Sequence, residues 1–261
     1  MKEEQASFRY QWENVYTETD IDIKKERKEF VRTSGIQPGW VRGKKALDMG
    51  SGAGRLSLVL DDMGAEVTSV DFVDACLMSI RRKSGRIRTV RSDFDSLPFR
   101  KGDFDLIICV GVLMCTPSPR KNFMKLVPLL RKGGLMHIMV YEKYNPLRLW
   151  LTHGLRRSMA RMPYEKRMRM CEKIAGLNSS AVLRNLAKLF IDVPHTARSA
   201  YDRYSNQYHS HHTEREVVGW FRDAGFDEIR VTSPITNTNP LSWFIKGKHR
   251  GVLFVTGRLR D

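Results

Sequence analysis

The sequence predicts an α/β fold: a doubly wound, mostly parallel seven-stranded sheet with a helical insertion. Short apolar runs alternate with amphipathic stretches between residues 44 and 141, which is typical of strands followed by helices. One run, 104–110 (FDLIICV), is apolar on both faces, as the central strands of parallel sheets are. A glycine-rich turn, DMGSGAGR over 48–55, joins the first strand to the first helix.

The predicted elements follow this alternation along the chain. Strands are expected at 45–49, 66–71, 86–91, 104–110 and 135–141, and helices at 55–63, 75–82 and 120–130. A later helix begins at Thr213, which has capping-box spacing to Glu216, and stops at Gly225. The last two strands, at 228–232 and 252–256, are expected to form an antiparallel hairpin at one sheet edge, and 201–212 a polar, aromatic loop.

A basic segment interrupts the alternation after the fifth strand. Residues 142–173 carry nine Lys or Arg against three Glu, with Leu, Met and Trp among them. This pattern predicts an amphipathic helical insertion reaching to about residue 190, broken at Pro163 and Gly176. The domains are therefore expected at 1–43 (an N-terminal lid or cap), 44–141 (the cofactor-binding core), 142–200 (the basic insertion, as an acceptor lid) and 201–261 (the rest of the core sheet).

Composition limits the classes of partner. The chain has 261 residues and a formal net charge of +16, which favours anionic partners or reflects a generally basic surface. None of the four cysteines forms a C-x-x-C pair, so neither a disulfide framework nor a zinc site is expected. The start is too polar for a signal peptide and the longest apolar run too short to cross a bilayer. We expect a cytoplasmic protein with no transmembrane segment.

The spacing of the turn glycines selects the ligand. A dinucleotide fingerprint, G-x-G-x-x-G, would need a third glycine at Arg55, but here Gly54 comes one position early. No Gly-Lys-Ser/Thr ends the turn, as a phosphate-binding Walker loop would require. Asp48 would face a pyrophosphate with like charge, whereas it would attract the sulfonium and ammonium of S-adenosyl-L-methionine (SAM).

Two further acidic residues follow the next strands. Asp71 ends the second strand, where a carboxylate can accept both ribose hydroxyls of an adenosine. Asp93 follows the third strand and is expected to accept from the adenine amino group while Phe94 packs on the ring. Since ligands of open α/β sheets bind at the carboxyl ends of the strands, the three carboxylates are expected at one site.

These motifs resemble the class I SAM-dependent methyltransferases, whose core is Rossmann-like. The similar stretches are ALDMGSGAGR, VTSVDF, SDFDSLPF, FDLIICVGVLMCTPSP and LLRKGG. The resemblance implies that Asp48, Gly50, Gly52 and Gly54 cradle the methionine part of SAM, with Val110 touching it through its backbone. It also implies that Asp71 and Phe72 hold the ribose, and Asp93 and Phe94 the adenine.

Three departures from the family pattern bear on function. Cys115 and Lys132 stand where many relatives have His and Pro, so no catalytic role is carried over to position 115. The motif N/D-P-P-Y, used on the amino groups of adenine, cytosine or glutamine, is absent after Val110. This absence argues against a nucleobase N-methyltransferase.

Methyl transfer to an aligned nucleophile does not require a dedicated catalytic side chain. If a base is used, His212 or His209 is the candidate, because each precedes a helix amino terminus, which disfavours imidazolium. The alternative is that His212 only packs beside the Thr213 cap. Metal binding by the histidines of this loop is not expected, because no carboxylate is suitably spaced.

Aromatic side chains are the candidate acceptor-binding groups. Tyr10 and Trp12 are expected to fold over the cofactor, or else to form an apolar clamp on the sheet. Tyr141, at the end of the fifth strand, and Tyr204, in the aromatic loop, are expected to line the acceptor pocket. Arginines of the insertion either bind an anionic acceptor or form a solvated helix face.

The favoured hypothesis is methyl transfer from SAM to a small-molecule or lipid or glycan-precursor acceptor, which we expect to be anionic. One alternative is an RNA methyltransferase that binds phosphates through the basic insertion. Another is a non-catalytic SAM-binding or membrane-surface protein that uses 145–173 as an interfacial helix. The oligomeric state is left open.

Overall fold

A computed structural model describes residues 9–10, 12, 21–143, 146–191, 193–206, 208–233 and 251–261; for residues 146–148, 188–190 and 202 it describes the backbone alone. The chain divides into two compact units. The sheet unit holds the described parts of 18–142, 210–234 and 251–261. The helical unit holds 143–209 and the described residues near the amino terminus.

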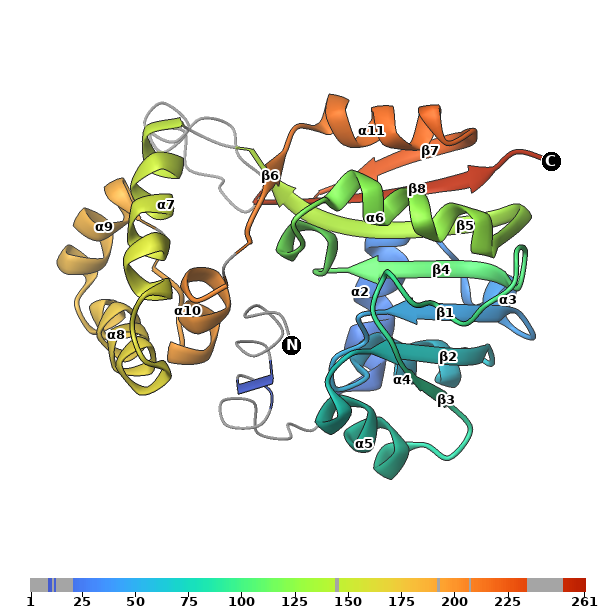
Figure 1. The fold of residues 1–261 in the computed structure, drawn as a ribbon, viewed down its shortest axis with the longest axis horizontal. Coiled ribbons are helices and arrows are strands. Elements are labelled where there is room, and N and C mark those ends of the chain that lie inside the picture. The colour runs from blue at the N-terminus through green and yellow to red at the C-terminus, as the bar shows by residue number, and fades with distance from the viewer. Residues whose placement is uncertain are drawn as a thin grey trace. The chain divides into compact units, whose positions relative to one another are not determined.

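The sheet unit is built on seven strands in the order β3-β2-β1-β4-β5-β8-β7, with a short β6 paired to β5 (Figure 1). Neighbouring strands from β3 to β5 are parallel, and β8 is antiparallel to both β5 and β7. The predicted doubly wound sheet and its late antiparallel hairpin are therefore confirmed. The strands are β1 (Lys45–Met49), β2 (Glu66–Asp71), β3 (Arg88–Arg91), β4 (Phe104–Val110), β5 (Leu130–Glu142), β6 (His211–His212), β7 (Phe226–Thr232) and β8 (Val252–Leu259).

Helices cover both faces of this sheet because the strands are apolar on both faces. On β4, Leu106 and Ile108 pack into one core cluster, and Ile107 and Cys109 into the other, as the two-residue period of a strand requires. The first cluster takes in α2 (Ile23–Ser34), α3 (Pro38–Val41), α4 (Arg55–Asp62) and α5 (Asp74–Lys83). The second takes in α6 (Pro119–Leu126) and α11 (Glu214–Asp223).

The helical unit contains α7 (Pro146–Ala160), α8 (Tyr164–Gly176), α9 (Ala181–Phe190) and α10 (Ala197–Tyr204). The breaks fall at Pro163, which caps α8, and at Gly176, which ends it, as the sequence predicts. Its core includes Met159, Cys171, Ile174, Tyr201 and Tyr204.

Two of the arginines of this unit are buried and serve its fold. The Arg167 guanidinium donates to the carbonyl oxygens of Ala160 and Met162 at 2.5 and 2.8 Å, where α7 ends. Arg156 Nε donates to the Arg203 carbonyl oxygen at 2.6 Å. Such contacts satisfy carbonyl groups that a helix end leaves without a partner.

Several predicted boundaries differ from the structure by two or three residues, and three predictions were wrong by more. The helix expected to reach residue 130 ends at Leu126, because Pro128 lacks an N–H and disfavours helical geometry at the residue before it. Strand β5 then begins at Leu130 rather than 135, and its register to β4 shifts between the pairs Phe104–Leu130 and Leu106–Leu135. Within the expected loop 201–212, α10 runs to Tyr204 because Thr196 caps it, and β6 pairs with β5.

Among the helices that the structure describes, none combines the length and apolar character needed to cross a bilayer. The expected cytoplasmic location stays a prediction.

One buried histidine makes the sheet unit sensitive to acid. His137 lies on β5, with Nδ1 2.9 Å from Thr256 Oγ1 and its ring beside Phe30 and Phe254. Burial lowers the pKa of His137 from 6.5 to about 3. The unfolded chain therefore binds one more proton between these values. The stability that neutral His137 contributes is complete above pH 6.5 and is lost as the pH falls toward 3.

We expect His137→Gln, which keeps a partner for Thr256, to weaken this dependence. The wild type should lose about 2 kcal/mol more free energy of unfolding than the variant between about pH 7.5 and about pH 5. Urea unfolding at both pH values measures the difference. Equal losses in the two proteins would show that His137 does not titrate in this way.

Candidate functional site

The glycine turn between β1 and α4 has a backbone that only glycine adopts without strain. Gly50, Gly52 and Gly54 have φ values of +75°, +52° and +87°. A Cβ at Gly50 would lie 2.4 Å from Val112 Cγ2, and one at Gly54 would lie 2.5 Å from Ile80 Cγ1. The turn is thus held between the loop after β4 and helix α5, with no room for a side chain at these two positions.

Asp71, at the end of β2, accepts hydrogen bonds from the glycine turn and from the start of the next turn, one with each carboxylate oxygen. Oδ2 accepts from the Gly52 N–H and Oδ1 accepts from the Val73 N–H, each at 2.9 Å. Burial raises the pKa of Asp71, and the backbone donors oppose that rise. A carboxylate offers about four acceptor positions, so Asp71 can hold the turn and still accept from a diol.

Asp48 is a second buried carboxylate at the same turn, 3% exposed. Ser57 Oγ, from the first turn of α4, donates to Asp48 Oδ2 at 2.6 Å, and Ser69 Oγ on β2 donates to Ser57 Oγ at 2.7 Å. Burial raises the pKa of Asp48 to about 6, against the lowering effects of the Ser57 hydrogen bond and the Arg55 charge, and the charge of Asp71 raises it further. A cation bound beside Asp48 would relieve this cost.

Asp93 and Phe94 occupy the loop after β3. Asp93 Oδ1 accepts from the Asp95 N–H at 2.9 Å, which shapes this loop as an Asx turn. Phe94 is half-buried against the core cluster that includes α6. Phe72 is likewise half-buried, in the turn that follows Asp71.

Strand register brings the predicted cofactor residues to one edge of the sheet. Asp48 pairs with Ser69 on β2 and with Ile108 on β4, two residues before Val110. Asp71 pairs with Arg91 on β3, two residues before Asp93. The nine residues predicted for the cofactor therefore follow neighbouring parallel strands at their carboxyl ends, where ligands of such sheets bind (Figure 1).

His212 lies in the sheet unit, in the short strand β6 beside the carboxyl end of β5. Its Nδ1 is 2.8 Å from Glu216 Oε1 and its Nε2 is 2.8 Å from Ser210 Oγ. Because an ionised carboxylate can only accept, Glu216 places the ring proton on Nδ1 and leaves Nε2 as an acceptor. The ring also packs edge-on against Trp220, 4.8 Å between centroids.

The Thr213 cap predicted next to His212 is confirmed, with Thr213 Oγ1 accepting from the Glu216 N–H at 3.2 Å. Tyr141, predicted to bind the acceptor, is half-buried on β5, and its ring lies 5.8 Å from that of His211. Catalysis by His212 and acceptor binding by Tyr141 stay predictions.

The other four predicted site residues belong to the helical unit. Tyr10 stacks on Tyr164 at 4.5 Å and lies 6.3 Å from Tyr201. Tyr204 is fully buried in the core of that unit, His209 is buried, and Trp12 is half-buried. Tyr10 and Tyr204 thus pack in the core of the helical unit, and the roles of these four residues in acceptor binding or catalysis stay predictions.

Four residues that support the site were missed in the sequence: Ser57, Ser69, Ile80 and Val112. Ser57 had a weak signal, because a serine in the first turn of a helix that follows a glycine turn can reach back to the strand. Ser69 is placed only by strand register, and Ile80 and Val112 only by tertiary packing.

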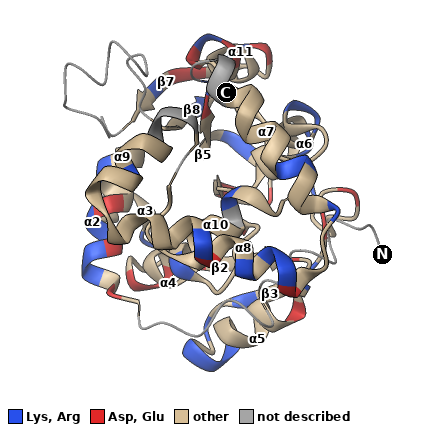
Figure 2. Ribbon diagram, turned by 90° about the vertical axis from the view of Figure 1, so that its left-hand side faces the viewer, with Lys and Arg blue, Asp and Glu red and all other residues tan. Residues whose placement is uncertain are grey.

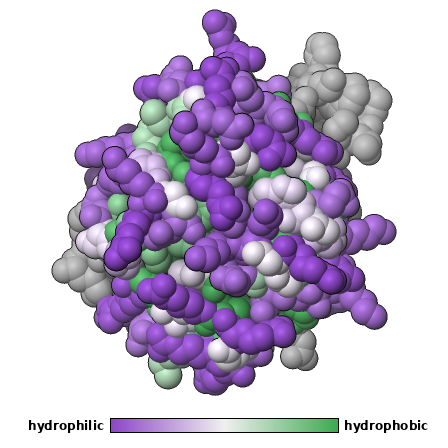
Figure 3. Space-filling view, turned by 90° about the vertical axis from the view of Figure 1, so that its right-hand side faces the viewer, coloured by the Kyte–Doolittle hydropathy of each residue, from purple (hydrophilic) through white to green (hydrophobic). Residues whose placement is uncertain are grey.

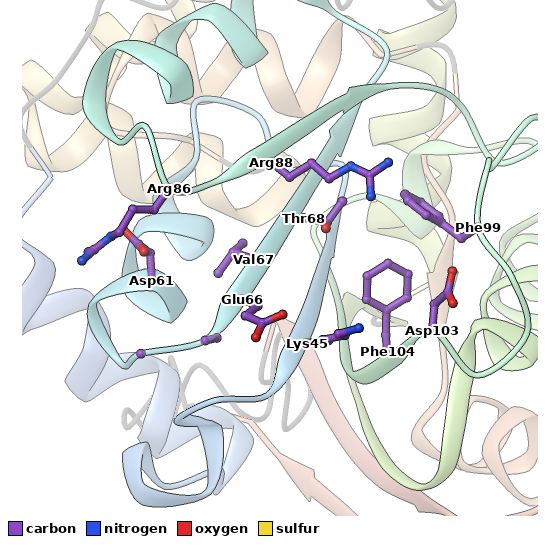
Figure 4. A pocket seen from close by; sticks show the side chains of 12 residues that line it. Lys45, Asp61, Glu66, Val67, Thr68, Arg86, Arg88, Phe99, Asp103 and Phe104 are labelled. Carbon is purple, nitrogen blue, oxygen red and sulfur yellow. The ribbon is translucent and has the colours of Figure 1, made fainter.

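A pocket of about 640 Å³ opens at the opposite edge of the sheet, where β1, β2 and β4 begin (Figure 4). Its three basic side chains, Lys45, Arg86 and Arg88, are balanced by Asp61, Glu66 and Asp103. Arg86 and Asp61 already pair at 3.0 Å. The face around these strand ends is mostly hydrophilic (Figure 3). The basic and acidic residues that line the pocket are equal in number, so their formal charges cancel.

Sequence comparison relates the chain to methyltransferases. A protein-family model described as a methyltransferase domain matches residues 47–138. A demethylmenaquinone methyltransferase of Clavibacter sepedonicus is 26% identical over 223 residues, 84% of this chain and 77% of that protein. A ubiquinone biosynthesis O-methyltransferase of Bordetella pertussis is 29% identical over 126 residues, 43% of this chain and about half, 52%, of that protein.

Structure comparison finds the same fold in solved methyltransferases. One is the 1,6-didemethyltoxoflavin-N1-methyltransferase of Burkholderia thailandensis, with S-adenosylhomocysteine bound: TM-score 0.54, 18% identity, covering 98% of this chain and 89% of that one. Another is an S-adenosylmethionine-dependent methyltransferase of Mesorhizobium loti: TM-score 0.53, 16% identity, covering 86% of this chain and 99% of that one.

The buried charge of Asp48 should lower the stability of the ligand-free protein and strengthen the binding of a cationic ligand. Its folded pKa of about 6 lies above the ordinary 3.8, so the folded chain binds more protons between these values and loses stability as the pH rises through them. Asp48→Asn should therefore raise the free energy of unfolding of the ligand-free protein at about pH 8, by at most about 3 kcal/mol. The gain should shrink as the pH approaches 4.

The same variant should bind SAM at least about tenfold more weakly, because the neutral amide no longer attracts the cation. Chemical unfolding and calorimetry measure the two effects. Asp223→Asn, which changes an exposed carboxylate paired with Arg120, is the control and should alter neither. A variant less stable than the wild type at pH 8 would contradict the electrostatic account of Asp48.

Proposed function

Because the chain is a class I S-adenosylmethionine-dependent methyltransferase, we propose that it methylates an anionic small molecule of the quinone-precursor or a related lipid-precursor class. The observation that carries the methyl-donor part of the proposal is the pair of buried carboxylates, Asp48 and Asp71, whose pKa values are raised by burial at one glycine turn. Two such groups favour a ligand with positive charge and with hydroxyls to donate.

The residues at the sheet edge fit this cofactor. The glycine turn and Asp48 would hold its methionine part, with Val110 contributing backbone contacts. Asp71 and Phe72 would hold the ribose. Asp93 and Phe94 would hold the adenine, the first through a hydrogen bond and the second by packing on the ring. The bound cofactor supplies a methyl group activated by a sulfonium.

The protein's part in the reaction is to align the acceptor and to manage one proton. An acceptor atom that carries a proton must lose it before or during methyl transfer, so a side chain beside the acceptor that can take up a proton would assist the reaction. His212 is the candidate for taking that proton, because Glu216 fixes the tautomer in which Nε2 can accept. Ser210 would then exchange its hydrogen bond to Nε2 for one to another partner.

The class of acceptor is inferred from the relatives and from charge. The curated relatives described above are named a demethylmenaquinone methyltransferase and a ubiquinone biosynthesis O-methyltransferase, and the second name specifies an oxygen as the methyl acceptor. A phenolic hydroxyl becomes a far better nucleophile when it loses its proton, and the phenolate is an anion. The basic excess of the chain, +16, favours binding of that form.

The direct test is to incubate the protein with SAM and a panel of short-chain hydroquinones and catechols. We expect S-adenosylhomocysteine and a product heavier by one methyl group, both detected by mass spectrometry. A parallel reaction with transfer RNA tests the nucleic-acid alternative. Methylated RNA together with unchanged hydroquinones would overturn the proposed acceptor and leave the methyltransferase chemistry standing.

Asp71→Ala should abolish the SAM-dependent thermal shift, because it removes the acceptors for the ribose and releases the turn at Gly52. Calorimetry should show SAM affinity at least about 100-fold lower. Asp74→Ala, three residues further on at an exposed position, is the matched control and should keep the shift. An undiminished shift in Asp71→Ala would disprove the ribose assignment.

A further inference from the structure

Helix α9 turns its apolar side to solvent. Val182, Leu183 and Leu186 are 69%, 51% and 56% exposed, and their spacing of one and four residues puts them on one helix face. Surface helices ordinarily bury their apolar stripe against the core. Within the described residues, the apolar face of α9 is therefore exposed to solvent, although such a face is ordinarily buried.

A fourth apolar group is exposed on the neighbouring helix of the same unit. Trp150, on α7, is 71% exposed, and α7 packs against α9. Of the six large apolar side chains exposed in the described chain, these four lie on α7 and α9. The other two, Met78 and Met124, stand singly on α5 and α6 of the sheet unit. The exposed apolar surface is thus concentrated in the helical unit.

The helical unit that holds this apolar surface also has a basic excess. Residues 143–209 carry 13 Lys and Arg against 4 Asp and Glu. Arg156 and Arg167 are buried and serve the fold, so they do not contribute to the surface charge. Other Lys and Arg positions lie along α7 and α8, as the blue ribbon segments of Figure 2 show. Among the described side chains of the unit, the exposed ones are Lys143, Arg157, Arg161, Lys166, Arg169 and Lys173.

We propose that the helical unit docks on an anionic lipid bilayer, with the open face of α9 inserted among the headgroups. Apolar side chains would gain by leaving water, Trp150 suits the interface between headgroups and hydrocarbon, and the exposed lysines and arginines would meet lipid phosphates. A nucleic acid would satisfy the charge but not the aliphatic face of α9. An anionic bilayer matches both the apolar face of α9 and the basic charge of the unit, and we therefore favour it over a nucleic acid.

This assigns the interfacial helix to 181–190 rather than to 145–173, where basic composition had placed it. The docking surface does not depend on which acceptor is methylated. It would, however, bring the enzyme to the surface where an acceptor with a lipid tail resides.

The test is flotation of the full-length protein with phosphatidylcholine vesicles, with and without phosphatidylglycerol. The wild type should float with the anionic vesicles at low salt and be released by high salt. Replacing Val182, Leu183 and Leu186 together with Gln should weaken binding at least about tenfold. Met78→Gln, which removes an exposed apolar side chain of the sheet unit, is the matched control and should bind as the wild type does.

Two measurements separate docking from folding and from catalysis. The SAM-dependent thermal shift should be the same in all three proteins, which shows that the cofactor site is intact. Trp150→Phe should remove the blue shift of tryptophan fluorescence that anionic vesicles cause in the wild type. Absence of the wild type from the floating fraction, or flotation of the triple variant to the wild-type level, would overturn the proposal. Retention on transfer RNA without vesicle binding would overturn it in favour of a nucleic-acid surface.

Discussion

The hydrogen bond from the Gly52 N–H to the Asp71 carboxylate is the interaction on which the candidate site depends. It joins the glycine turn after β1 to the end of β2, so the two strand ends that would hold the cofactor cannot move independently. Burial makes the ionised form of Asp71 costly, and the backbone donors offset part of that cost. The site is thus organised before a ligand arrives, which lowers the entropy lost on binding.

Asp48, on the β1 side of the same turn, is also fixed by hydrogen bonds before a ligand binds. Its carboxylate is held by a chain of two serine hydroxyls, one from α4 and one from β2. A buried carboxylate with a pKa near 6 destabilises the ligand-free protein at neutral pH. Functional sites commonly keep such unfavourable charges because the ligand compensates them. Here the compensating ligand is a cation, which agrees with a sulfonium cofactor.

The helical unit shows why charge alone is a poor guide to a binding surface. Its sequence carries a large basic excess, yet Arg156 and Arg167 are buried and donate to backbone carbonyl groups. Conversely, α9, which carries only two charged residues, Arg184 and Lys188, leaves aliphatic side chains in solvent. The combination of exposed apolar and exposed basic groups distinguishes a membrane-facing surface from a purely phosphate-binding one.

The sequence by itself determined the parallel core, the late antiparallel hairpin and the place of the glycine turn, since each follows from local periodicity and from residues with restricted backbone geometry. It also placed three carboxylates at successive strand ends, because parallel strands bring their carboxyl ends to one edge. Tertiary structure decided what local patterns do not encode. Strand register set Ser69 beside Asp48, packing of Val112 and Ile80 fixed the glycines, and Tyr204, expected to line the acceptor pocket, is buried in the core of the helical unit. The solvent exposure of a side chain depends on all its neighbours in space. It identified α9 as the helix with an exposed apolar face, whereas composition had placed the interfacial helix at 145–173.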